Sequence, residues 1–200
     1  IIAVRANSMS AGGKYIAVSL RARNNNGSAR DFSFWSDDYG ANWQLFVVGG
    51  VEQRGNFTPN ISGTGSIIAV VKNGSLADSF YSSDNGQTFN VIDYSAMNQT
   101  ANLNARPAMS YTGQYYNLVG SSNKIFYGSD FQLTINNSLV TTGNPTNVRM
   151  DNSGETQIYI DEGNSSPEYQ ITQDFGQTWS PVASLPNSYG VGRTFLIDTT

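Results

Sequence analysis

The chain has 200 residues, a net charge of −4 and only 13% charged residues, whereas aromatic residues make up 12%. This length allows one domain with a sizeable core, and the acidic balance argues against a nucleic-acid partner. The chain has neither cysteine nor histidine, which excludes a disulfide framework, the commonest zinc ligands and the commonest general base. We therefore expect no metal and no cofactor. No stretch approaches the ~20 apolar residues of a membrane span.

Strand signals recur in groups along the chain, as short apolar or alternating runs bounded by Gly, Asn and Ser. In chain order the predicted strands are 15–22, 31–36, 66–72, 79–83, 106–110, 115–120, 124–129, 134–140, 157–161 and 169–173. The groups divide a single domain, or part of one, into repeats at approximately 1–52, 53–101, 102–145 and 146–188, with a partial repeat at 189–200. Four antiparallel strands per ~45 residues are typical of a β-propeller blade.

The clearest mark of the repeat is an octet that closes each third strand. The four octets are SDDYGANW at 36–43, SSDNGQTF at 82–89, GSDFQLTI at 128–135 and TQDFGQTW at 172–179. The shared frame is a hydroxyl residue, Asp two positions later, Gly two further on, and a large apolar residue at the end. The third octet departs from this frame, with Gly128 in place of the hydroxyl residue and Gln132 in place of Gly.

Each octet predicts a tight hairpin between the third and fourth strands of a repeat. An Asp side chain accepts the backbone N–H groups that such a turn leaves unpaired, and Gly supplies a positive φ. The final apolar residues, Trp43, Phe89, Ile135 and Trp179, are expected to pack between blades. The other structural residues of the frame are Ser36, Asp38, Gly40, Ser82, Asp84, Gly86, Asp130, Thr134, Thr172, Asp174 and Gly176.

This frame closely resembles the Asp-box, or bacterial neuraminidase repeat (BNR), of sialidases, sortilin-type receptors, some xyloglucan hydrolases and photosystem assembly factors. The resemblance implies an all-β fold, a β-propeller of four-stranded antiparallel blades with four full blades and the first strand of another. In that family the Asp-box is a structural hairpin away from the ligand face. Two alternatives remain open for the ring: a parent with more blades, or residues 190–200 pairing with the first blade to close a small ring.

Strand parity places the candidate ligand face at the opposite end of the blades, with the second-to-third loops and the connections between blades. The loop over 21–31 carries Arg21, Arg23 and Arg30, which suit an anion such as a carboxylate, sulfate or acidic sugar. Arg5, Arg106 and Arg193 precede first strands and are expected near the channel, where the resemblance implies a sialidase-like arginine triad. Tyr94, Tyr189 and Phe57 are candidate platforms for stacking on sugars.

These features favour a non-catalytic recognition or scaffold module that binds a glycan or a protein, with an extracellular or virion-surface location and a place in a larger chain or assembly. The alternatives are a glycoside hydrolase, sialidase-like or otherwise, and a photosystem-type assembly factor. For the hydrolase, Asp161, Glu162, Glu168 and Asp93 are the acids nearest the expected ligand face. A sialidase also needs a nucleophilic Tyr with a Glu partner and an acidic Asp, which the sequence does not identify.

Overall fold

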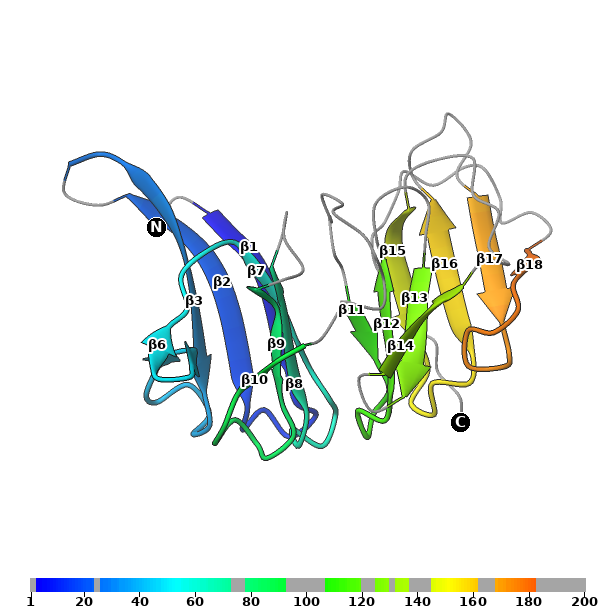
Figure 1. The fold of residues 1–200 in the computed structure, drawn as a ribbon, viewed down its shortest axis with the longest axis horizontal. Coiled ribbons are helices and arrows are strands. Elements are labelled where there is room, and N and C mark those ends of the chain that lie inside the picture. The colour runs from blue at the N-terminus through cyan, green and yellow to red at the C-terminus, as the bar shows by residue number, and fades with distance from the viewer. Residues whose placement is uncertain are drawn as a thin grey trace.

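The computed structural model describes residues 3–23, 26–72, 78–92, 107–119, 125–129, 132–136, 145–161 and 168–182. These residues form four four-stranded antiparallel sheets and one small two-stranded sheet. In each of the four sheets the strands lie in sequence order, each beside the next, so every sheet is a simple meander (Figure 1). The fold is all-β with propeller-type blades, as the repeat predicts.

We number the four large sheets as blades 1 to 4. Blade 1 contains β1 (Ala3–Met9), β2 (Ile16–Arg23), β3 (Ala29–Ser36) and β4 (Gln44–Leu45). Blade 2 contains β7 (Phe57–Ile61), β8 (Ile68–Lys72), β9 (Phe80–Ser82) and β10 (Asn90–Val91). Blade 3 contains β11 (Pro107–Met109), β12 (Tyr115–Val119), β13 (Ile125–Ser129) and β14 (Gln132–Asn136). Blade 4 contains β15 (Pro145–Met150), β16 (Gln157–Asp161), β17 (Glu168–Thr172) and β18 (Ser180–Pro181).

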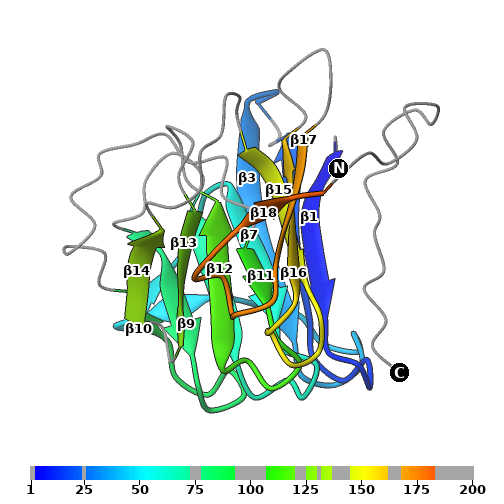
Figure 2. The ribbon, with the colours of Figure 1, turned by 90° about the vertical axis from the view of Figure 1, so that its right-hand side faces the viewer.

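The blades follow one another in space as they do in sequence, with blade 1 and blade 4 at the two ends of the row (Figure 1). Their first strands lie side by side, since β1 contacts β7, β7 contacts β11, and β11 contacts β15. Figure 2 views the row from the side of blade 4, with β18 toward the viewer. Each blade therefore has a back face toward the preceding blade and a front face toward the next one.

Strand alternation sends neighbouring residues to these two faces. In β8 of blade 2, Ile68 and Val70 pack with blade 1, whereas Ala69 and Val71 pack with blade 3. All four side chains are fully buried, which explains why β8 is a continuous apolar run. A third cluster, around Val148 and Tyr159 among others, joins blades 3 and 4. The core thus consists of layers between blades.

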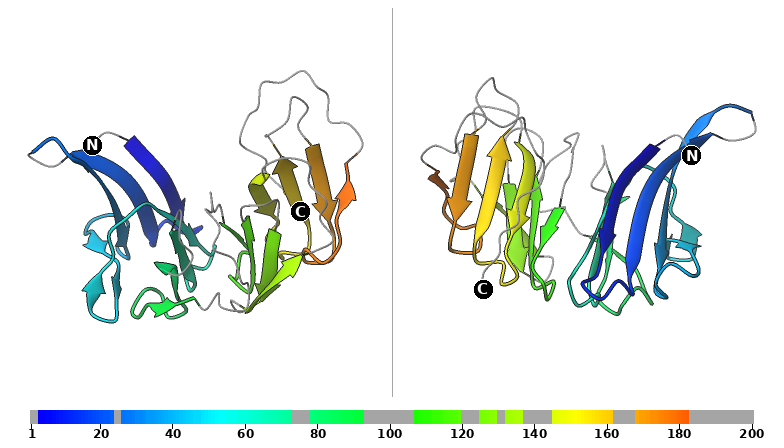
Figure 3. Two further views of the ribbon diagram at one scale, coloured as in Figure 1. Left: turned by 45° about the horizontal axis from the view of Figure 1, so that its top comes forward. Right: turned by 180° about the vertical axis from the view of Figure 1, so that it is seen from behind.

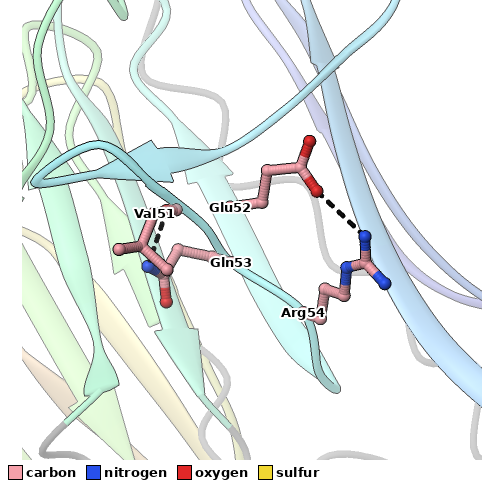
Figure 4. Close-up of polar contacts among 4 residues, drawn as sticks. All are labelled: Val51, Glu52, Gln53 and Arg54. Atoms are coloured by element: carbon pink, nitrogen blue, oxygen red, sulfur yellow. Dashed lines mark hydrogen bonds and ion pairs between the residues drawn. The ribbon is translucent and has the colours of Figure 1, made fainter.

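An additional hairpin connects blade 1 to blade 2. Its strands are β5 (Val47–Val48) and β6 (Val51–Glu52), and Gly49 and Gly50 turn between them with φ values of 56° and 81°. Figure 4 shows the end of this hairpin, where Gln53 Nε2 donates to the Val51 carbonyl at 3.0 Å and Arg54 pairs with Glu52 at 3.0 Å. The strands predicted from the sequence did not include this hairpin.

The third blade differs from the octet prediction. Its third and fourth strands are paired from Ser129 opposite Gln132 to Ile125 opposite Asn136, so the fourth strand begins inside the octet and not at residue 134. Thr134 consequently lies in β14, opposite Tyr127, and not in a hairpin loop. This octet lacks the hydroxyl residue and the Gly of the frame, so the strands pair directly across a shorter connection. Asp130 lies outside the described residues.

Candidate functional site

The Asp-box of blade 2 is a closed hydrogen-bonded turn. Asp84 Oδ1 accepts from the Thr88 backbone N–H at 2.9 Å and from Ser82 Oγ at 2.7 Å, while Oδ2 accepts from Thr88 Oγ1 at 2.6 Å. Ser82 Oγ in turn accepts from the Gly86 N–H at 2.8 Å. The hydrogen bonds from the Thr88 hydroxyl and N–H, followed by that from Ser82, lower the pKa of Asp84 to about 2. The carboxylate is therefore ionised and fully occupied within its own turn.

The boxes of blades 1 and 4 repeat this geometry. Asp38 accepts from the Asn42 N–H at 2.8 Å, and this bond is the main reason why its pKa is lowered. At Asp174, partial burial alone would raise the pKa, but hydrogen bonds from Thr172 and Thr178 outweigh it and the pKa is lowered. Each of the three carboxylates accepts hydrogen bonds from the residue two positions before it and the residue four positions after it. This arrangement suits a structural role, and the lowered pKa values do not suit a general acid.

In blades 2 and 4, the residues at the tip of the box contact the preceding blade. In blade 2, Gly86 has a φ of 84°, and an added Cβ would lie 2.5 Å from the ring of Trp35 in blade 1. Asn85 Nδ2 donates to the Tyr15 hydroxyl of blade 1 at 2.9 Å. In blade 4, the Phe175 ring stacks on Tyr115 of blade 3 with centroids 4.3 Å apart. The boxes therefore join blades together.

The final apolar residue of each box was predicted to pack between blades, and the outcome differs from blade to blade. Phe89 packs edge-on against Trp35 and Phe46 of the first repeat, at 5.7 and 5.2 Å between centroids. Trp179 is partly buried against Tyr159 of its own blade. For Trp43 the prediction is wrong, since it is 45% exposed. Trp43 belongs to blade 1, which has no blade packed on its back face among the described residues. The side chain of Ile135 lies outside the described part.

The turns between the first and second strands of each blade are a second set of structures that join the blades. Each turn begins with a side chain that accepts from the backbone N–H five residues later, at 3.0 to 3.3 Å; these side chains are Ser10, Ser62, Ser110 and Asp151. Backbone bonds then link successive turns, from the Ala11 N–H to the Gly63 carbonyl at 2.9 Å and from the Tyr111 N–H to the Asn152 carbonyl at 2.9 Å. The sequence signal for these turns is a Ser or Asp three residues before a Gly, as in Ser10 and Gly13.

The opposite end of blade 1 carries the predicted arginines, but not in a loop. β2 extends to Arg23 and β3 begins at Ala29, so Arg21, Arg23 and Arg30 all lie in strands. The pairing of β2 with β3 continues as far as Arg23 opposite Ala29, so these two strands form a long ribbon (Figure 1). The register pairs Arg21 with Asp31 and Arg30 with Ala22, which places Arg21 and Arg30 on opposite faces of the ribbon. The expected cluster is therefore divided between two faces.

Arg5 joins the Arg21 side of the ribbon. Its Nε lies 3.8 Å from the Asp31 carboxylate, and Asp31 is the residue paired with Arg21. By contrast, Arg54 and Lys72 elsewhere in the chain are paired with Glu52 and Asp78. Blade 1 thus carries four arginines at this end, with Arg5, Arg21 and Arg23 on the face of Asp31 and Arg30 on the other face, on a chain whose net charge is −4.

The remaining predicted ligand residues fall outside the site as described. Arg106, Arg193, Tyr94 and Tyr189 lie outside the described residues. Phe57 is not a stacking platform, because it is the first residue of β7 and only 1% exposed, with its ring against Phe80. Within the described ranges, no group of three or more His, Cys, Asp or Glu residues is arranged to hold a metal ion, and no helix is long and apolar enough to span a membrane.

Comparisons with known proteins agree with this architecture. The family profile of the BNR/Asp-box repeat matches residues 170–181, whereas no curated protein matches the chain in sequence. A GH74 xyloglucanase from Xanthomonas campestris is similar in structure, with a TM-score of 0.58 and 10% identity, over 90% of this chain and 38% of the enzyme. The chain thus spans well under half of that enzyme.

Two further similar structures contain a bound partner. YCF48 bound to D1 peptide has a TM-score of 0.50 and 11% identity, over 89% of this chain and 81% of that one. A chain of the nidogen/laminin complex has a TM-score of 0.58 and 10% identity, over 91% of this chain and 65% of that one. At these identities the likeness concerns the fold alone.

Proposed function

We propose, from the premise that the chain is an Asp-box repeat protein made of β-propeller blades, that it is a non-catalytic recognition or scaffold module. It binds an acidic glycan or an acidic protein segment through the end of the blades opposite the Asp-box turns. An extracellular or particle-surface location belongs to the same proposal. The observation that carries it is the ribbon of blade 1, where β2 and β3 carry Arg21, Arg23 and Arg30, and where Arg5 of β1 pairs with Asp31.

The charge balance of this ribbon supports recognition of an anion. Among the ion pairs of the described residues, the Asp31 carboxylate pairs with Arg5 and with no other arginine of blade 1. Guanidinium groups bind carboxylates and sulfates with paired hydrogen bonds, so the other arginines suit such groups on a ligand. Because Arg21 and Arg30 occupy opposite faces, the ligand wraps the ribbon or uses one face of it.

The Asp-box turns, at the end of the blades away from the arginine ribbon, support the non-catalytic part of the proposal. The Asp-box carboxylates are ionised and engaged within their turns, and two of the similar folds carry a peptide or protein partner. A scaffold of rigid blades that presents side chains from strand ends and loops is a common arrangement for recognition.

The proposal is tested on a panel of immobilised sialylated, sulfated and neutral glycans, together with acidic peptides. The test variant combines Arg21→Ala, Arg23→Ala and Arg30→Ala. The matched control removes the same charge outside blade 1's ribbon, by combining Lys14→Ala, Lys72→Ala and Arg149→Ala. Binding of an acidic ligand that is lost in the test variant and kept in the control supports the proposal. Equal loss in both variants means unspecific charge attraction and contradicts it, as does a folded chain that binds no member of the panel.

A glycoside hydrolase is the second candidate, because the register of blade 4 pairs Asp161 directly with Glu168 at the loop end of β16 and β17. Hydrolysis of glycosides uses a pair of acids on the two sides of the scissile bond, and these two strand residues are the candidates for such a pair. Release of reducing sugar from a bound glycan, abolished by Glu168→Gln, would establish this candidate. Binding without release keeps the recognition module. The photosystem-type alternative is tested by the peptides of the panel.

A further inference from the structure

The back face of blade 1 has the same construction as a face that is buried elsewhere in the molecule. In blade 2, Val70 of β8 is paired with Phe80 of β9, and both are covered by blade 1, with exposures of 0% and 1%. In blade 1, Val18 of β2 is paired with Phe34 of β3 at the same place in the repeat. Both residues of this pair are only half-buried. The two pairs occupy equivalent positions and consist of the same residue types. Among the described residues, however, only the pair in blade 2 is buried under a preceding blade.

The Asp-box of blade 1 shows the same difference. Asn85, at the tip of the blade 2 box, contacts Tyr15 of the preceding blade, and Phe175 of blade 4 contacts Tyr115. Tyr39 has the same backbone conformation, with a φ of 62°, and it is 70% exposed. With Val18, Phe34 and the exposed Trp43, it forms the open back face of the row. Figure 3, in its right-hand view, shows β1 and β2 with no other strand in front of them.

The front face of blade 4 is the complementary surface. Ile158 of β16 is paired with Ile171 of β17, at the place of Ala17 and Trp35 in blade 1. In blade 1 this pair is buried under blade 2, whereas Ile158 and Ile171 are half-buried. A hollow of about 250 Å³ lies beside Ile171, and its lining includes Ser180 and Thr178.

The hollow lies beside Ile171, the residue equivalent to Trp35, on which a box residue of the following blade packs in blade 1. The ring centroid of Phe89, from blade 2, lies 5.7 Å from that of Trp35 in blade 1. Trp35 is the residue equivalent to Ile171. Trp43 is the residue equivalent to Phe89. A copy of this chain therefore displays both halves of the contact that joins its own blades, one half at each end of the row.

We infer that the chain associates head to tail with a second copy of itself, the back face of blade 1 in one copy packing on the front face of blade 4 in the other. Trp43 enters the hollow beside Ile171, and Val18 and Phe34 pack over Ile158. The interface is heterologous, since different surfaces meet, so repetition produces a closed ring or an open filament.

Sedimentation velocity on the intact chain tests this inference at concentrations up to about 100 μM, where even an interface of micromolar Kd is populated. The wild-type chain is expected to sediment as species heavier than the 21.7 kDa monomer. Two surface variants each block one half of the contact: Trp43→Arg on the back face of blade 1, and Ser180→Arg in the hollow of blade 4. Near-ultraviolet circular dichroism verifies that each variant is folded.

The two variants are then mixed. Each variant alone is expected to be a monomer, whereas the mixture is expected to form a dimer and nothing larger, because one intact pair of surfaces remains between the two chains. A wild-type monomer throughout the concentration range overturns the inference, and shows that blade 1 is covered by something else. Variants that associate like the wild type, or a mixture that stays monomeric, overturn the head-to-tail arrangement.

Discussion

The contact between a box glycine and the preceding blade allows a sharp test of how the blades are joined, by the substitution Gly86→Ala. At a φ of 84° a side chain costs about 1–2 kcal/mol. The added Cβ would also lie 2.5 Å from two ring atoms of the buried Trp35. Overpacking of this kind costs about 1–3 kcal/mol, so we expect a total loss of about 2–5 kcal/mol in the free energy of unfolding.

Gly40→Ala is the matched control. Gly40 has the same place in its box and a φ of 83°, but an added Cβ would be no closer than 3.5 Å to Trp43 of its own turn. Only the backbone cost of about 1–2 kcal/mol is therefore expected. Urea unfolding followed by fluorescence measures both values. Equal losses for the two variants would refute the argument that the boxes join blades, because the clash with Trp35 is what separates them.

Three further predictions follow from the same contacts. Because the pKa of Asp84 is lowered to about 2 from an ordinary 3.8, its contribution to stability is complete above pH 3.8 and is lost as the pH falls toward 2. Unfolding midpoints measured against pH should therefore depend less on acid in Asp84→Asn than in the wild type; identical curves would contradict this. Trp35→Ala should cost about 3–5 kcal/mol in urea unfolding, because the ring is buried against Phe46 and Phe89, and a loss below 1 kcal/mol would contradict that packing. Asn60→Ala should cost about 1 kcal/mol by removing the 2.7 Å bond from its Nδ2 to the Pro107 carbonyl between blades 2 and 3, and an unchanged midpoint would exclude that bond.

The repeat and the chemistry of its turns could be read from the sequence because they depend on local geometry. Asp84, Gly86 and a hydroxyl at Ser82 are needed at a fixed spacing to close one hairpin, so the spacing alone predicts the turn. The third blade also follows this logic, since Gln132 stands where the frame has Gly, and Gln132 is there paired in a strand opposite Ser129.

The burial of individual side chains could not be predicted in this way, because it depends on which blade covers which face. Trp43 and Phe89 have the same place in their repeats, yet among the described residues Phe89 packs against a preceding blade and Trp43 does not. Likewise, the spacing of Arg21 and Arg30 does not reveal strand register, which assigns them to opposite faces of one ribbon. Phe57 has the appearance of a loop aromatic in the sequence and is buried between blades in the structure.

Hydrogen–deuterium exchange on the intact chain, with and without a bound acidic glycan or peptide, shows which end of the blades binds the ligand. We expect slower exchange on binding in the ribbon of blade 1, at the ends of β2 and β3 that carry Arg21, Arg23 and Arg30, with the Asp-box turns unchanged. Protection of the turns around Asp38, Asp84 and Asp174, with an unaffected ribbon, would contradict it and assign recognition to the end that we describe as architecture.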